Sequence, residues 1–598
     1  MKVLGISLGH DTNFSLVQDG EIKEVWEVER YYRQKRYKLH ALSLDAGKQM
    51  SGYQYVDIEE LRLFIDRIHE KWGSSFDAIA VQNQGREEEF ENLKTLLKEG
   101  GIHGNCIENI NHHLSHASLA FYTSPFEESL ILSFDGTGND GYTIFFKTEK
   151  DGSLSYLESV DLRMGQSYNN LGFIVGINAD ISGTSSGKTM GLAAYGGVRE
   201  EWLEQALKYV REYKVLKKKK VEGIKHYGNT HTINSIGLRD IEDLRKYHIV
   251  TEKKETSKTT KQRIKLFLGL DNKVNTAEPL NVEMKLPGPD HQDSQDLVKV
   301  VQAAWTQVVM ELIEKHKGVS KNFCMVGGCA LNGVTNYDIQ KNGMFDQYHF
   351  IPNPTDCGLA SGAALHLYHK LSKVGFNGYN RYYSPYLGEE AYDKEDIEKL
   401  KEQYPHKEVS ADQTASHLAK FIADSKVMGV FRGRYEIGPR ALGNRSILCN
   451  PLNKDMRDIL NHKVKHREWY RPFAPVCSEE DASRYFTNVT EIPYMSVICF
   501  TKDDYRDVLP SITHLDGTCR LQTVNADQND FLHVTIKEFE KITGHPVLLN
   551  TSYNPGGEPI VNYYNVALDM LNTTQMDIVL IEDTFFVKKG AEDLLEGL

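Results

Sequence analysis

The sequence predicts an α/β protein with more than one domain. Short apolar runs typical of buried strands occur at residues 3–7, 130–134 and 323–326, and each leads into a loop that contains glycine. Stretches with the charge pattern and apolar spacing of amphipathic helices lie between them, at 58–72 and 87–99. At about 150 residues per domain, a chain of 598 residues is expected to form roughly two to four domains.

The composition is that of an ordinary globular protein. The chain has 40% hydrophobic and 26% charged residues and a formal net charge of -13, so its overall charge disfavours broad contact with a phosphate backbone. None of its eight cysteines forms a Cys-x-x-Cys pair, which indicates reduced thiols. No stretch reaches the roughly 18 apolar residues that span a bilayer, and the N-terminus lacks an export signal. We therefore expect a cytoplasmic protein that binds neither nucleic acid nor a membrane.

The first loop of the chain is small and polar. Its sequence at residues 9–13, Gly-His-Asp-Thr-Asn, lies between the strand at 3–7 and a predicted hairpin with the turn Asp19-Gly20. This loop is suited to a phosphate or a substrate, with His10 as the candidate functional side chain. Alternatively, the loop's Asp and Asn residues only shape the turn.

Two histidines and an aspartate form a candidate metal site. His112 and His116 are four residues apart, and on a helix this spacing brings both imidazoles to one face. Asp135 stands where the strand at 130–134 opens into the loop Asp-Gly-Thr-Gly. A carboxylate suits a metal ion there, and Gly136, Thr137 and Gly138 supply backbone that can approach a phosphate closely. The alternative is a capped surface helix with ordinary histidines, followed by a strand and a turn.

A glycine-rich segment at 182–196 resembles a P-loop only superficially. A Walker A motif has four residues between its first glycine and Gly-Lys, whereas Gly183 and Gly187 are separated by three. Lys188 is a candidate anion contact or else an ordinary solvated lysine. From 200 to 290, lysine-rich patches replace the apolar runs, which predicts a surface insertion with helices.

The strand at 323–326 leads into a double glycine and a helix. That arrangement lets a nucleotide lie against bare backbone, so Gly327, Gly328 and Asn332 are candidate nucleotide contacts. Asp356 follows a proline-rich turn and precedes a helix of small residues. It either completes the metal site formed by the two histidines and the first aspartate, or caps the helix that follows.

Cations gather in the last third of the chain, beyond a domain boundary expected near residues 379–387. They alternate with glycines, prolines and aromatics in an otherwise acidic protein. These cations are Arg434, Arg440, Arg445, Lys465, Arg467 and Arg471. Arginine binds phosphate and carboxylate through two hydrogen bonds, so the cluster predicts a partly buried anion pocket. Ion pairs with Glu436 and Glu468 are the alternative. Later strand-to-loop positions add Arg520, Asn550 and Ser552.

Together these segments resemble the O-carbamoyltransferases of antibiotic, nodulation-factor and toxin biosynthesis. The resemblance covers both ends and most of the length of the chain. The motifs that carry it are Gly9-His10-Asp11, the segment 112–117, the segment 135–138, the segment 187–196, the segment 327–332, the segment 438–446, and the elements at 465–469, 471–475 and 550–552. Each motif is short, but their joint order is specific.

The resemblance implies two domains and a two-step reaction. Residues 1–380 would adopt the actin-like ATPase fold of the Kae1 group, with two subdomains and an insertion at 200–290, and residues 381–598 would be similar to YrdC. The C-terminal domain would condense ATP with carbamoyl phosphate into carbamoyl-adenylate and pyrophosphate. The N-terminal domain would then transfer the carbamoyl group to a hydroxyl of a small natural product and release AMP.

The matching motifs also imply residue roles. The residues expected to hold carbamoyl phosphate and the nucleotide phosphates, and to screen their charge, are Arg440, Lys465, Arg471, Arg520, Asn550 and Ser552. His112, His116, Asp135 and Asp356 would ligate a divalent metal, for which iron, manganese and zinc are all compatible, and magnesium would accompany ATP. His10 would accept the proton of the acceptor hydroxyl, as a histidine that is neutral near pH 7 can. The identity of the acceptor stays open, as does the oligomeric state, with a homodimer as one option.

Two other functions compete with this one. A tRNA threonylcarbamoyl-transfer module shares the two domain types, but the net acidity and the presence of both domains in one chain argue against it. A non-catalytic nucleotide switch or chaperone on the actin-like fold explains the glycine loops but not the arginine cluster. The loop at 554–556 and the insertion at 200–290 depart from the resembled family.

Overall fold

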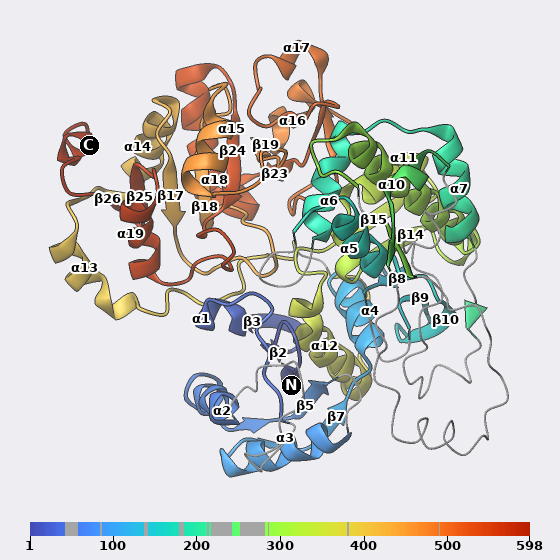
Figure 1. Cartoon of the computed structure of the whole chain (residues 1–598). Helices are drawn as coiled ribbons and strands as arrows, with labels where there is room; N and C mark the ends of the chain where they lie inside the picture. The colour runs from blue at the N-terminus through green and yellow to red at the C-terminus, as the bar shows by residue number, and fades with distance from the viewer. Residues whose placement is uncertain are drawn as a thin grey trace, which may run out of the picture.

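The computed structural model describes residues 1–41, 58–83, 87–136, 141–178, 185–211, 215–216, 242–251, 281–284, 286–379, 382–489 and 491–598 (Figure 1). Two predictions fall outside these ranges. They are the phosphate contacts at Thr137 and Gly138, and the domain boundary between residues 380 and 381. Most of the expected insertion at 200–290 also falls outside them.

The first sheet has the strand order β3-β2-β1-β5-β7. Its strands are β1 (Lys2–Ser7), β2 (Asn13–Gln18), β3 (Glu21–Glu27), β5 (Ala78–Gln82) and β7 (Ile107–Asn109). The first three are antiparallel, and β5 and β7 run parallel to β1. Asp19 and Gly20 both have positive φ, as a tight two-residue hairpin turn requires. The predicted helices α2 (Ile58–Trp72) and α3 (Glu87–Glu99) share one hydrophobic core with this sheet, into which their apolar side chains are buried.

The second sheet repeats the pattern of the first. Its order is β11-β10-β9-β8-β14-β15, made of β8 (Leu130–Phe134), β9 (Thr143–Thr148), β10 (Leu154–Val160), β11 (Val215–Leu216), β14 (Asn322–Val326) and β15 (Gln347–Phe350). Strands β8, β9 and β10 are antiparallel, and β14 and β15 run parallel to β8. A duplicated sheet of this order, three antiparallel strands followed by two parallel ones, is the arrangement expected of an actin-like ATPase fold.

Two buried helices lie side by side between the two sheets (Figure 1). Helix α4 (His112–Tyr122) contacts β8 and β14, and α12 (Leu359–Ser372) contacts β1 and β5. Small residues permit this close packing, because a Cβ on Gly5 would overlap the carbonyl of Ala360 and one on Gly362 would overlap the carbonyl of Ser115. Both helices therefore begin at the junction of the two sheets.

The remaining N-terminal helices pack around the second sheet. Long helix α10 (Gln292–Glu314) buries apolar side chains along its length. Helix α7 (Glu200–Val210), at the start of the expected insertion, contacts α10 and buries Trp202. Strands β12 (His248–Thr251) and β13 (Asn281–Met284) form an antiparallel pair.

The C-terminal part is built on a mixed eight-stranded sheet. Its order is β16 (His406–Glu408), β26 (Thr584–Val587), β25 (Ile578–Ile581), β17 (Met428–Phe431), β18 (Arg445–Cys449), β24 (Val547–Ser552), β19 (Ala474–Ser478) and β23 (Gln522–Val524). Helices α14 (Ala411–Ala423) and α18 (Ala526–Thr543) share a core with one face, and α19 (Tyr564–Thr573) packs on the other. The predicted α/β class is confirmed, and a mixed sheet covered on both faces agrees with the YrdC-like expectation.

One segment of the C-terminal part crosses back into the N-terminal core. Tyr435 and Ile437 are fully buried in the cluster that contains Val3, Ala117 and Cys324. The loop between β17 and β18 is thus shared by both halves of the molecule. Among the helices in the described ranges, none has the length and apolar character needed to cross a membrane.

Candidate active sites

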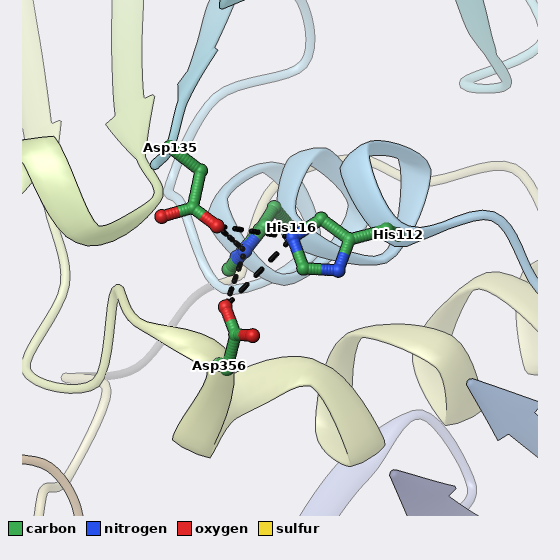
Figure 2. A group of neighbouring side chains, drawn as sticks. All are labelled: His112, His116, Asp135 and Asp356. Carbon is green, nitrogen blue, oxygen red and sulfur yellow. Dashed lines mark hydrogen bonds and ion pairs between the residues drawn. The ribbon is translucent and has the colours of Figure 1, made fainter. Parts of the chain in front are cut away.

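The predicted metal ligands meet at the junction of the two N-terminal sheets (Figure 2). His112 and His116 come from α4, Asp135 from the end of β8, and Asp356 from a 3-10 turn that precedes α12. All four side chains are buried, and one ligand atom from each lies within 4.8 Å of the others. Asp356 lies inside the 3-10 turn and the N-cap residue of α12 is Gly358, so Asp356 does not cap that helix.

The histidine spacing works as the sequence predicts. Asn111 caps α4 by accepting a hydrogen bond from the N–H of Leu114, at 3.1 Å. The imidazoles one turn apart have ring centroids 4.8 Å from each other. Nε2 of His112 lies 3.0 Å from Asp135, and Nε2 of His116 lies 3.4 Å from Asp356. The surface-helix alternative is wrong, because α4 is buried along almost all of its length.

The electrostatics of this cluster fit a divalent cation. Burial opposes a charge on His116, but contacts with Asp135 and Asp356 outweigh it and raise its pKa to about 9. Although burial acts in the opposite direction, contacts with the histidines hold the pKa of Asp135 well below its usual value. Both ring nitrogens of His116 lack a hydrogen-bond partner in the described part of the chain. Two buried carboxylates facing two imidazoles, one of them unsatisfied, form a donor set that suits iron, manganese or zinc.

Backbone from the double-glycine loop completes the surroundings of the cluster. The N–H of Gly328 donates to Oδ1 of Asp135 at 2.9 Å. A Cβ on Gly328 would stand 2.9 Å from that same oxygen. Gly327 has a φ of 95°, and a Cβ there would overlap the carbonyl of Phe134. The two glycines therefore bring β14 close enough to orient the Asp135 carboxylate.

His10 borders the metal cluster. Its Nε2 lies 3.2 Å from Asp356 and its Nδ1 lies 2.9 Å from Asp11. Burial lowers the pKa of His10, but the carboxylates of Asp356 and Asp11 produce a net rise. Asn13 does more than shape the turn, since its amide donates to the carbonyl of Asp356 at 2.8 Å and its Oδ1 accepts from the N–H of Ala360 at 3.0 Å. The sequence shows a short polar loop here, but it does not indicate that Asn13 bonds the turn that carries Asp356.

The C-terminal cations gather around the loops that follow the central strands. Arg440 lies between β17 and β18, Arg520 follows β22 (Thr518–Cys519), and Asn550 and Ser552 lie on β24. Burial lowers the pKa of Arg440, and repulsion from Arg520 and Arg471 lowers it further. The same combination of burial and neighbouring cations lowers the pKa of Arg467, and burial with Arg471 lowers that of Arg520 to about 10. Like charges are thus brought together.

Lys465 is deeply buried, with 4% of its surface exposed. Its ammonium donates to Oδ1 of Asn554 at 2.8 Å, to the carbonyl of Asn554 at 3.2 Å and to the carbonyl of Ser552. All these partners are neutral. Burial, together with Arg467 and Arg471, lowers the pKa of Lys465 well below its usual value.

Few counter-charges balance the cluster. In the described ranges no carboxylate lies within ion-pair distance of Arg440, Lys465, Arg467 or Arg520, and Glu468, 3.7 Å from Arg471, also pairs with Lys188 at 2.6 Å. Three buried atoms of the cations and of the neighbouring Asn550 have no hydrogen-bond partner in the described ranges. These atoms are Nε of Arg440, Nε of Arg520 and Oδ1 of Asn550. Burying so many like charges is unfavourable unless an anion joins them.

Other predicted contacts have different surroundings. Arg434 and Arg445 donate mainly to backbone carbonyls, so these two of the six clustered cations brace the loop. Lys188 is paired with Glu468 and is not simply solvated. Asn332 caps α11 (Gly333–Asn342) and donates to Gln302. A Cβ on Gly136 would meet nothing within 4 Å, which leaves its backbone open.

Comparison with known proteins defines the class. The family model described as carbamoyltransferase N-terminus matches residues 93–365, and the one described as carbamoyltransferase C-terminus matches residues 419–589. The chain belongs to the carbamoyltransferase family, and the predicted enzyme class, an O-carbamoyltransferase, is confirmed.

Similar proteins are found among nodulation proteins. Nodulation protein NolNO of Sinorhizobium fredii is 30% identical over 97% of this chain and 79% of its own length. Nodulation protein NolO of Bradyrhizobium diazoefficiens is 30% identical over 81% of this chain and 80% of its own. Among solved structures, component A of (R)-2-hydroxyglutaryl-CoA dehydratase from Acidaminococcus fermentans covers 62% of this chain and 99% of its own length, at 13% identity and a TM-score of 0.31.

Proposed function

We propose that this carbamoyltransferase works in two ATP-dependent steps, each in its own domain. Carbamoyl phosphate is activated as carbamoyl-adenylate in the C-terminal domain, residues 381–598. The carbamoyl group then passes to a hydroxyl of a small natural product in the N-terminal domain, residues 1–380. The observation that supports this division best is the group of neighbouring cations with few counter-charges, which has no residue in common with the metal-ligand cluster.

In the first step, cationic side chains bring two polyanions together. Carbamoyl phosphate and ATP repel each other, and Arg440, Lys465, Arg471 and Arg520 screen that repulsion. Water and carbamoyl phosphate give carbamate and phosphate, a carbamate oxygen bonds to the α-phosphorus of ATP, and pyrophosphate leaves. Asn550 and Ser552 supply neutral hydrogen-bonding groups at the edge of the same cluster. Catalysis here is electrostatic, because charge accumulates on the departing pyrophosphate.

In the second step, His10 accepts the proton of the acceptor hydroxyl as the oxygen attacks the carbamoyl carbon. Its Nδ1 faces Asp11, which fixes the ring and stabilises the imidazolium that forms. His112, His116, Asp135 and Asp356 would hold a divalent metal. When bound, the metal supplies positive charge that neutralises the adenylate phosphate and improves AMP as a leaving group.

The intermediate needs protection from water on its way between domains. The segment 435–438 is buried in the N-terminal core, and Lys188 pairs with Glu468 across the two halves, so the domains are in close contact. We propose that carbamoyl-adenylate passes internally. Recovery of most of the intermediate from bulk solvent during turnover would contradict this.

The direct test is product analysis without acceptor. Incubation of the protein with ATP and carbamoyl phosphate should release one phosphate and one pyrophosphate for each ATP consumed, and neither product should form at that rate when carbamoyl phosphate is omitted. Formation of ADP without pyrophosphate would contradict the proposal. Mass spectrometry with a panel of hydroxylated natural products would then identify the acceptor.

A further inference from the structure

A buried ion pair of the N-terminal domain grips the loop that carries Arg440. Glu27 ends β3, and Arg30 lies in the helix α1 (Val28–Tyr32) that follows. Nε of Arg30 donates to Oε2 of Glu27 at 2.6 Å, and the two side chains are 1% and 3% exposed. A pair buried this deeply costs desolvation energy, so its remaining contacts show what it is used for.

Those contacts go to the shared loop. The second terminal nitrogen of Arg30 donates to the carbonyls of Glu436 and Gly438, at 2.7 and 3.0 Å. The other carboxylate oxygen of Glu27 accepts from the N–H of Gly438 at 2.6 Å. Tyr435 adds a third anchor, because its hydroxyl bonds the backbone of β3 and its ring lies under the Arg30 guanidinium at 4.4 Å.

The contacts of the Glu27–Arg30 pair restrict the backbone of the residues just before Arg440. Gly438 has a φ of 92°, and a Cβ there would overlap the carbonyl of Pro352. The loop is therefore pressed between the Glu27–Arg30 pair on one side and the turn before Asp356 on the other. Arg440 follows one residue after Pro439, whose ring restricts the backbone further. The backbone two residues before Arg440 is therefore held by contacts made in the N-terminal domain.

The same edge of the first sheet also holds the metal-ligand turn. Glu27 lies directly across from Asn13 in the β2–β3 ladder. Asn13 in turn bonds the carbonyl of Asp356 and the N–H of Ala360. Of these two cross-strand neighbours, Asn13 therefore holds the turn that carries Asp356, and Glu27 holds the loop that carries Arg440.

We propose that Glu27 and Arg30 are positioning residues for the C-terminal, anion-binding step, acting through the loop that carries Arg440. This inference rests on the proposed function, because it assigns a purpose to Arg440. A side chain outside the C-terminal domain would then control how tightly the arginine cluster binds an anion. Asn13 would serve the other centre and leave anion binding unchanged.

A double-mutant cycle on pyrophosphate affinity tests this with the full chain. Glu27→Gln keeps the volume but places an amide group against Arg30, so we expect calorimetric binding of inorganic pyrophosphate to weaken about tenfold. In an Arg440→Met background, the same change should alter the affinity less than about twofold, because the effect acts through Arg440. Glu21→Gln, on the same strand and outside the grip, should bind like wild type.

The outcomes separate the inference from the proposed function. Equal effects of Glu27→Gln in both backgrounds, or wild-type binding by Glu27→Gln, would overturn the positioning role alone. Absence of pyrophosphate binding by the wild type would overturn both. Arg30→Lys, which keeps the charge but cannot reach the carboxylate and both carbonyls together, enters the same cycle if Glu27→Gln does not fold. A rise in the KM for carbamoyl phosphate with an unchanged Tm would agree with the inference.

Discussion

His116 is the residue whose surroundings best fit a bound cation. It is fully buried between two carboxylates, and neither ring nitrogen is satisfied in the described ranges. Its neighbour His113, by contrast, bonds Ser133 and the carbonyl of Gly141 and points away from the cluster's ligand set. One histidine of the helix is therefore structural, in agreement with the four-residue spacing that predicts His112 and His116, and not His113, as the pair on one face.

We expect His116→Ala to lower the affinity for a divalent metal by more than about 100-fold, because a direct ligand is lost. Titration calorimetry with manganese, supported by metal analysis after dialysis, measures this. His113→Ala is the matched control and should keep the metal. The metal site would be wrong if His116→Ala bound manganese like the wild type.

Glu29 gives a pH dependence with a defined sign. Burial and the charges of Asp11 and Glu27 raise its pKa from 4.5 to about 7. Between these values the folded protein holds a proton that the unfolded chain releases, so stability is lost as the pH rises. Glu29→Gln should therefore stabilise the protein at pH 8 by about 2 kcal/mol or less, and the gain should shrink toward pH 5. Urea unfolding at both pH values measures it, and an equal gain at both would contradict this explanation.

Among the elements, the double-glycine loop after β14 shows how a close approach of the backbone shapes the site. Gly328→Ala would place a Cβ 2.9 Å from Oδ1 of Asp135 and push that carboxylate from its hydrogen bond. We expect about a tenfold loss of metal affinity with little change in Tm. Gly318→Ala, where a Cβ meets nothing within 4 Å, is the control. Metal affinity unchanged in Gly328→Ala would show that this glycine does not orient Asp135.

Local patterns predicted the elements well. The strands at 130–134 and 323–326 are present with those bounds or within one residue of them, and the His-x-x-x-His spacing forms one face of α4. These features depend on neighbours in sequence. What the patterns lack is pairing between distant segments, such as β8 beside β14, or the contact of Glu27 with Gly438. For that reason the sequence does not predict the contact between the Glu27–Arg30 pair and the loop. It also predicts anion contacts for Arg434 and Arg445, which instead donate mainly to backbone carbonyls.

At the scale of the whole molecule, one loop links the N-terminal core with the C-terminal cations. The residues near 435–438 pack in the N-terminal core, while Arg440, a few positions later, joins the C-terminal cations. The order of motifs in the sequence indicated both centres and their chemistry. It did not indicate that the halves interlock, because interlocking depends on surfaces far apart in the chain.

Single-turnover release of pyrophosphate from ATP and carbamoyl phosphate, compared between two variants, tests the division of labour most directly. His10→Ala should release one equivalent at the wild-type rate and fail only in carbamoylating an acceptor. Arg471→Ala should slow the release by at least about 100-fold, because it removes a cation facing the departing pyrophosphate. Loss of pyrophosphate release in both variants, or its retention in Arg471→Ala, would contradict the assignment of the two steps to two domains.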